Sequence, residues 1–104
     1  MKNSKLQGYF GFARKSRTLV SGYETCIQMI KRKKIKLVLI TSGASERTRE
    51  KFRKLCEKEG IPLIWAEDPS WIEEMTGLSG RNIFGITDTN LAKAIAKEIE
   101  TMSM

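Results

Sequence analysis

Apolar and polar positions along this chain follow two different periods, and the change from one period to the other marks the predicted elements. The stretch 18–40, TLVSGYETCIQMIKRKKIKLVLI, has a β-prone start, a helical middle and a continuously apolar end. In the middle, apolar residues recur at the spacing of one helix face: Tyr23, Cys26, Ile27 and Ile30. Ser21 and Glu24 have the spacing of a capping box, which predicts a helix that begins at Gly22. The stretch therefore predicts a β-α-β unit.

The chain before and after this unit continues the alternation. A capping box over residues 4–7 predicts a first helix, whose buried stripe is Leu6, Tyr9, Phe10 and Ala13. Ser45 is placed to cap a helix over 46–59, which Gly60 ends. The inner face of that helix is marked by Phe52, Leu55 and Cys56. Its outer face mixes both charges, which is typical of a solvated helix surface with i,i+4 ion pairs.

The last third of the chain predicts two strands and two helices. Residues 62–65 and 83–86 read as short apolar strands. Between them, a capping box over residues 70–73 predicts a short helix that ends near Gly77. Asp88 is placed to cap a final helix, whose apolar side is Leu91, Ala92, Ile95, Ile99 and Met102. The order α-β-α-β-α-β-α-β-α predicts one α/β domain over 1–104, a three-layer α/β/α sandwich with a four-stranded mixed sheet.

Composition limits the class of protein. No apolar run approaches the roughly 20 residues of a membrane helix, and the N-terminus lacks the pattern of a signal peptide, so we expect a cytoplasmic protein with no membrane partner. Cys26 and Cys56 each fall on a predicted apolar helix face. Burial as small hydrophobic residues is the favoured interpretation, with a disulfide or redox pair as the alternative.

The net charge of +7 is unevenly distributed. Residues 1–36 hold ten Lys or Arg and one acidic residue, a net charge of +9, whereas residues 37–104 hold nine basic and eleven acidic residues, a net charge of −2. Such segregation favours a face that neutralises phosphates. Nucleic acid is therefore the favoured partner, ahead of an anionic membrane, because no basic helix has a large apolar face.

Residues for catalysis are scarce. The chain has no histidine, no CxxC pair, and none of the GxxxxGK[ST], GxGxxG or GxSxG motifs. The adjacent acids at 67–68 and 73–74 sit at a predicted turn and a predicted helix start, where capping and solubility account for them. We therefore expect a binding protein rather than an enzyme, with no metal and no cofactor.

Several of these stretches, taken together in this order, carry a family resemblance. GYETCIQMIKRKKIKLVLI resembles the core signature of the ribosomal L7Ae/L30e superfamily, and the preceding FARKSRTLVSG is similar to the family's ARKSGKLVxG. The helix after Ala44 and the Gly60-Ile61-Pro62 turn also resemble family segments. The resemblance covers nearly the whole chain. Within the family, the chain is most similar to the small bacterial ribosomal-protein-like members.

The resemblance implies an α/β/α sandwich that binds kink-turns, which are sharply bent RNA helices with tandem sheared G·A pairs. Carried over residue by residue, the contacts at the start of the second helix fall on Ser21, Gly22, Tyr23, Glu24, Thr25 and Gln28, with Arg32 one turn further along. Lys31, from the basic run that ends this helix, is added to the predicted interface. A covering loop falls on Gly80, Arg81, Asn82 and Ile83, where Ile83 is expected to pack on a splayed base. Basic residues of the first loop complete the predicted interface: Arg14, Lys15 and Arg17. We expect these cationic segments to flank the helix start at Gly22.

This chain departs from strong kink-turn binders at three positions. They often place Asn, Glu and Lys where this chain has Glu24, Thr25 and Gln28. Glu24 has two open interpretations, a capping-box carboxylate and an RNA contact. The departures predict altered or weaker kink-turn preference.

The sequence thus predicts a non-catalytic, monomeric RNA-binding protein. Its expected partner is structured RNA, either ribosomal or kink-turn-containing, and we expect it to associate with the ribosome. The alternative is a protein-protein interaction adaptor on the same fold, without RNA binding.

Overall fold

Helices and strands alternate along the whole described chain. The computed structural model describes residues 4–102, with side chains up to residue 101. The elements are α1 (Ser4–Lys15), β1 (Leu19–Ser21), α2 (Tyr23–Lys31), β2 (Leu37–Thr41), α3 (Glu46–Glu59), β3 (Leu63–Ala66), α4 (Pro69–Thr76), β4 (Ile83–Ile86) and α5 (Thr89–Met102). The order is the predicted one. The side chain of Met102, predicted on the apolar side of α5, lies outside the described part.

The four strands form one mixed sheet in the order β1-β4-β2-β3. β2 pairs parallel with β3, whereas β4 lies antiparallel between β1 and β2. β2 lies in the interior of the sheet and all five of its residues are buried, which explains why its first four residues are apolar. The prediction of a four-stranded mixed sheet is confirmed.

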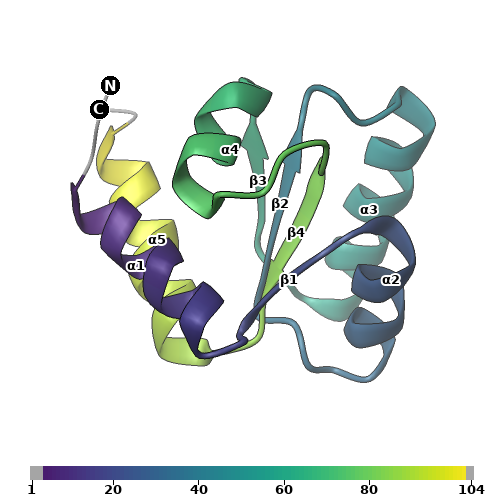
Figure 1. Cartoon of the computed structure of the whole chain (residues 1–104). Helices are drawn as coiled ribbons and strands as arrows, with labels where there is room; N and C mark the ends of the chain where they lie inside the picture. Colours follow the sequence, from purple (N-terminus) through teal and green to yellow (C-terminus); the bar gives the residue numbers. More distant parts are fainter. Residues whose placement is uncertain (1–3, 103–104) are drawn as a thin grey trace.

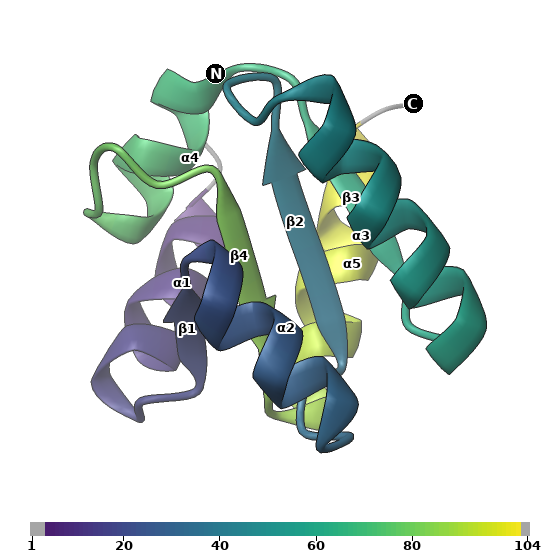
Figure 2. The same cartoon turned by 90° about the vertical axis from the view of Figure 1, so that its right-hand side faces the viewer.

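Helices cover both faces of the sheet, giving three layers (Figures 1 and 2). On one face lie α1, α4 and α5, and their apolar stripes pack with Leu37 and Leu39 of β2. On the other face lie α2 and α3, which pack with Val38 and Ile40. Alternate residues of β2 thus supply two separate apolar cores, as the period of a strand requires.

The starts of the helices show which local signals decide where a helix begins. Ser45 caps α3 by accepting the Thr48 N–H at 3.1 Å, and Asp88 accepts the Leu91 N–H at 2.8 Å before α5, as predicted. The predicted cap at Ser70 is wrong, because Asp68 accepts the Ser70 N–H at 3.0 Å and Pro69 already occupies the first turn of α4. Proline suits that position because it has no N–H to satisfy. Ser4, also predicted as a cap, is itself helical.

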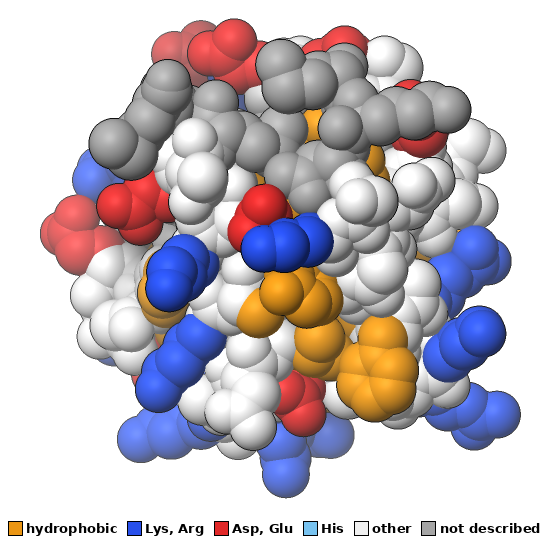
Figure 3. Space-filling model, turned by 90° about the vertical axis from the view of Figure 1, so that its left-hand side faces the viewer, with side chains coloured by type: hydrophobic (Ala, Val, Ile, Leu, Met, Phe, Trp, Pro, Cys, Tyr) orange, Lys and Arg blue, Asp and Glu red, His pale blue; other side chains and the backbone are white. Residues whose placement is uncertain are grey.

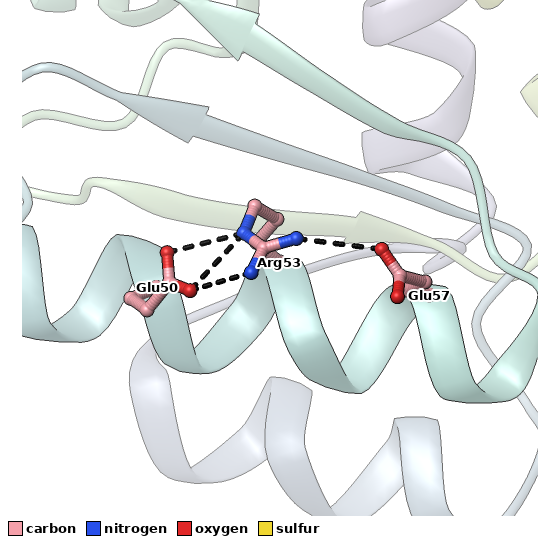
Figure 4. A network of polar contacts seen from close by, with 3 residues as sticks. All are labelled: Glu50, Arg53 and Glu57. Carbon is pink, nitrogen blue, oxygen red and sulfur yellow. Dashed lines mark hydrogen bonds and ion pairs between the residues drawn. The ribbon is translucent and has the colours of Figure 1, made fainter.

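The outer face of α3 carries the predicted ion pairs. Arg53 binds Glu50 at 2.6 Å and Glu57 at 3.3 Å, one turn away on either side (Figure 4). All three side chains are largely exposed, so the pairs add little to stability. This face of α3 is a solvated helix surface.

Both cysteines are buried and free, which agrees with the favoured interpretation over a disulfide. They belong to the apolar core beneath α2 and α3. Burial raises the pKa of the Cys26 thiol to about 12 and that of the Cys56 thiol to about 11. Among the described residues, no helix is both long and apolar enough to cross a membrane.

Candidate nucleic-acid interface

The start of α2 is built differently from the other helix starts. Ser21 is the last residue of β1, and Gly22 occupies the cap position without a side-chain hydrogen bond to the helix. The predicted capping box of Ser21 and Glu24 is therefore wrong. The first helical hydrogen bond runs from the Cys26 N–H to the Gly22 carbonyl at 3.1 Å. The N–H groups of residues 23–25 precede it and have no acceptor within the helix.

Gly22 is required by its backbone conformation. Its φ of 101° and ψ of 151° lie in a region that is essentially restricted to glycine. The strand leaves the sheet at this point, because the Gly22 N–H still donates to the Ile83 carbonyl at 3.0 Å while its carbonyl already belongs to the helix. Gly22 thus ties the start of α2 to the start of β4.

Arg81 lies directly over Gly22. A Cβ atom built on Gly22 would stand 3.3 Å from Nη1 of Arg81. The guanidinium group therefore sits at the positive end of the α2 dipole, where a cation is disfavoured and an anion is favoured. Among residues 4–102 no carboxylate is within salt-bridge distance of Arg81. This pairing of a helix N-terminus with a cation is suited to a phosphate.

A hollow of about 320 Å³ opens at this point, and three segments line it. They are the start of α2, the covering loop and the loop that leads into α3. We call this set the mouth site: Gly22, Tyr23, Gly43, Ala44, Ser45, Thr48, Gly80, Arg81, Asn82 and Ile83. The structure thus brings together two segments that lie about 60 residues apart in the chain, as the family resemblance implied.

The covering loop is held by hydrogen bonds at both ends. The Glu73 carboxylate accepts the Gly80 N–H at 3.1 Å, and the Thr76 hydroxyl accepts the Leu78 N–H at 3.2 Å. Arg14 donates from Nη1 to the Thr76 carbonyl at 3.1 Å. Arg14, predicted as an RNA contact, is exposed, and it also fixes the end of α4 through this hydrogen bond.

At its other end the covering loop is fixed through a buried hydroxyl. Thr41 is fully buried, and its hydroxyl donates to Oδ1 of Asn82 at 2.6 Å while accepting the Gly43 N–H at 3.1 Å. The Thr41 N–H also donates to the Asn82 carbonyl at 2.9 Å. A Cβ on Gly43 would collide with the Asn82 side chain. One hydroxyl therefore sets the relative position of two of the three segments of the mouth site.

Tyr23, rather than Ile83, offers aromatic or apolar surface at the mouth site. Ile83 is only 5% exposed and belongs to the core, so the expectation that it packs on a splayed base is not supported. Tyr23 is 36% exposed, and its ring meets Phe52 edge to face at a centroid distance of 5.6 Å. Lys51 places Nζ 5.6 Å from the same ring centroid. Tyr23 thus packs at the edge of the predicted apolar stripe and keeps part of its surface exposed.

Other predicted contacts lie beside the mouth site without lining it. Ser21 is half-buried in β1. Three residues of α2 are exposed along the helix that starts there: Glu24, Thr25 and Gln28. With the capping box absent, the capping interpretation of Glu24 is lost.

The basic segments do not flank the mouth site. The Thr87 N–H donates to the Thr18 carbonyl at 2.9 Å, and the Lys36 N–H donates to the Ile86 carbonyl at 2.7 Å. Both segments therefore lie at the end of β4 opposite to Ile83, which contacts Gly22. We call these exposed residues the basic end: Lys15, Arg17, Lys31, Arg32, Lys33, Lys34 and Lys36. The expectation that they surround Gly22 is wrong, because α2 and β1 each carry the chain from one end of the sheet to the other.

Sequence reasoning missed the third segment of the mouth site, residues 43–45 together with Thr48. Ser45 had been identified only as a cap. Residues 41–45 follow a strand that ends beside β4, but this neighbourhood depends on the strand order, which the sequence pattern leaves open. Among the described residues, no group of three or more His, Cys, Asp or Glu side chains could hold a metal ion.

Known proteins resemble this chain over most of its length. It is 30% identical over 96 residues to a protein of Enterococcus faecium named RNA-binding protein YlxQ, covering 92% of each chain. It is 29% identical over 85 residues to RNA-binding protein YlxQ of Bacillus subtilis strain 168, covering 82% of this chain and 85% of that one. A solved structure described as a protein with unknown function from Bacillus halodurans C shares the fold, with a TM-score of 0.86 and 22% identity over 94% of this chain and 99% of that one.

The same relationship appears at the level of the family. The family described as "Ribosomal protein L7Ae/L30e/S12e/Gadd45 family" matches residues 4–96, which includes every element from α1 to most of α5. Both parts of the mouth site that the resemblance identified lie within this match. The chain therefore belongs to the ribosomal protein L7Ae/L30e/S12e/Gadd45 family.

Proposed function

We propose that this protein binds structured RNA of the kink-turn type through the mouth site, as a non-catalytic component of a ribosome-associated ribonucleoprotein. Membership of the family and the RNA-binding names of two relatives support RNA as the partner. The net charge of +7 agrees with a polyanionic partner. The proposed contacts are the mouth site together with Ser21, Glu24, Thr25 and Gln28.

The observation that carries this proposal is the position of Arg81 against Gly22. The Arg81 guanidinium and the uncapped N–H groups of α2 meet at one hollow, and both favour an anion. A phosphate of a sharply bent backbone satisfies both groups at once. Because Gly22 has no side chain, the phosphate can approach the helix backbone closely.

Recognition in this arrangement depends mainly on shape. Many of the residues that line the hollow are small, and three of them are glycines. The larger side chains are Tyr23, Arg81, Asn82 and Ile83. Oδ1 of Asn82 is already bound by Thr41, which leaves its amide N–H groups as donors at the edge of the hollow. Phosphates position such a complex, while the few base contacts give it modest sequence preference. This agrees with the altered kink-turn preference expected from Glu24, Thr25 and Gln28.

Replacement of Arg81 tests the proposal. Arg81→Gln keeps a side chain of similar reach but removes the charge, so we expect about tenfold weaker binding to a kink-turn RNA, the effect of losing one charged hydrogen bond. Fluorescence anisotropy titrations would compare this RNA with a regular duplex of equal length. Lys97→Gln is the matched control, because Lys97 is an exposed cation on α5, away from the mouth site.

Two outcomes contradict the proposal. Equal affinity of the wild-type protein for the kink-turn and the duplex contradicts shape recognition. Equal losses in Arg81→Gln and Lys97→Gln contradict the assignment of the mouth site. Purification of a stoichiometric protein partner that survives nuclease treatment, with no RNA affinity, supports the adaptor alternative.

A further inference from the structure

The end of the sheet opposite to the mouth site combines a dense group of cations with an exposed aromatic ring. We propose that the basic end and Phe12 form a second RNA-binding surface, which takes single-stranded nucleotides that continue from the structured RNA held at the mouth site. This inference rests on the proposed function in that both surfaces bind one RNA, but its evidence lies in different residues.

The cations of the basic end come from two segments of the chain, the end of α1 with the loop after it and the end of α2 with the loop after it. Lys15 is the last residue of α1 and Arg17 follows the helix, whereas Lys36 precedes β2 on the far side of β4. All seven residues of the basic end are exposed, and among residues 4–102 none has a carboxylate within salt-bridge distance. Their mutual repulsion destabilises the free protein and is relieved by a bound polyanion.

The dipole of α2 accounts for part of this charge only. Lys31 and Arg32 lie at the C-terminal end of that helix, where cations are favoured in any protein. Lys15 likewise ends α1, where the dipole of that helix favours a cation. Arg17 and Lys36 lie outside the helices and have no such reason to lie at this end of the sheet. The backbone is also held in the left-handed region at Arg17, with φ of 62°, and at Lys33, with φ of 61°. These tight turns bring the charged segments back against the sheet.

Phe12 is the most exposed of the large hydrophobic side chains in the described chain, at 59%. It lies near the end of α1, one turn before Lys15, so the ring and the ammonium group share a helix face. Gly8 and Gly11 are its neighbours on the helix surface, and a Cβ on either would meet nothing within 4 Å. Neither glycine has a side chain that could cover the ring.

The surface around this helix shows the same combination. Figure 3 views the face formed by α1 and α5, where apolar side chains gather in the lower half and Lys and Arg side chains surround the lower rim. Carboxylates lie mainly in the upper part of this face. Exposed apolar surface and cations thus occur together in the lower part of this face.

Single-stranded RNA fits this chemistry better than a duplex does. Unpaired bases stack on an aromatic ring, while neighbouring cations follow the phosphates. In a duplex the base faces are stacked on one another, so they are not available to stack on Phe12. The α2 helix spans roughly 13 Å, at 1.5 Å per residue, between the mouth site and the basic end, so one RNA can contact both.

The test compares three RNAs with one set of variants. The RNAs are a kink-turn with blunt stems, the same kink-turn with a single-stranded extension of about six nucleotides on either stem, and the single strand alone. The variants are Phe12→Ala and Lys15→Gln, with Trp65→Ala as the control for an exposed aromatic residue and Lys97→Gln as the control for an exposed cation. Circular dichroism checks that each variant is folded.

We expect one of the extensions to strengthen binding by the wild-type protein. Phe12→Ala should remove at least about fivefold of affinity for that RNA, the effect of losing one stacked base, and leave the blunt kink-turn unaffected. Lys15→Gln should reduce the salt dependence of binding to the extended RNA by about 0.7 in the log–log slope. Neither control should change these quantities.

The result separates the two proposals. Equal binding to the blunt and extended RNAs overturns this inference and leaves the kink-turn proposal intact. Failure to bind any kink-turn, with Phe12-dependent binding of the single strand, overturns the kink-turn proposal and supports the second surface. Phe12-dependent binding to vesicles of anionic lipid, without an effect of the RNA extension, overturns the inference in favour of a membrane contact.

Discussion

At the scale of single residues, the mouth site depends on the contact between Gly22 and Arg81, which the sequence alone could not predict. Gly22 and Arg81 were each identified through the family resemblance, but their contact depends on β4 lying next to β1. The role of Gly22 was also different from the predicted one. It is the cap residue itself, in a conformation restricted to glycine, rather than the first residue of a helix capped by Ser21.

Replacement of Gly22 by alanine should destabilise the fold. Because a side chain at φ 101° is strained, we expect Gly22→Ala to lower the free energy of unfolding by about 1 to 3 kcal/mol. Gly8→Ala is the control, since Gly8 lies inside α1 with open space around it and should gain about 0.5–1 kcal/mol. Urea unfolding measures both values, and equal effects of the two substitutions would contradict the assigned conformation.

At the scale of elements, the alternation of helices and strands could be predicted because each segment has a clear hydrophobic period. The caps were predictable only where no neighbour overrides the local signal. Ser45 and Asp88 cap the helices that follow them, as predicted. At α4 the cap is Asp68 instead of the predicted Ser70, because Pro69 already occupies the first turn of the helix. At Ser21 the strand pairing with β4 continues through the residue, which keeps it extended within the sheet.

Two serine substitutions distinguish a true cap from a false one. Ser45→Ala removes the acceptor of the Thr48 N–H and should lower the free energy of unfolding by about 1 kcal/mol. Ser21→Ala removes no cap hydrogen bond, and its effect should stay within about 0.5 kcal/mol. Thermal or urea unfolding of both variants measures the difference. A larger loss of unfolding free energy in Ser21→Ala than in Ser45→Ala would support a capping box at Ser21.

At the scale of the whole molecule, the sequence showed that positive charge is concentrated in residues 1–36 but not where it lies. A pattern of helices and strands does not fix the strand order, and the order decides which loops share an end of the sheet. With β4 between β1 and β2, the two basic segments meet each other instead of meeting Gly22. The mixed sheet and its three layers could be predicted, whereas the division into two surfaces could not.

The core beneath α2 and α3 should keep both thiols protonated in alkaline solution. Folding raises the pKa of Cys26 and Cys56 above the ordinary value of 9.0, to about 12 and about 11. The unfolded chain therefore loses these protons first, and the thiols lower the stability of the fold as pH rises from about 9 to about 12. Ultraviolet absorbance of the thiolate should stay absent near pH 10 until urea is added. A thiolate signal in the folded protein at that pH would show that the cysteines are accessible.

The hydroxyl of Thr41 has a practical consequence for exchanging parts between relatives. It accepts a hydrogen bond from the backbone N–H of Gly43 in one segment and donates a hydrogen bond to the Asn82 side chain of another. A chimaera that imports residues 80–83 from a relative without Asn82, or residues 41–45 from a relative without Thr41, would leave one partner of this hydrogen bond unpaired. The two stretches have to be transplanted as a unit.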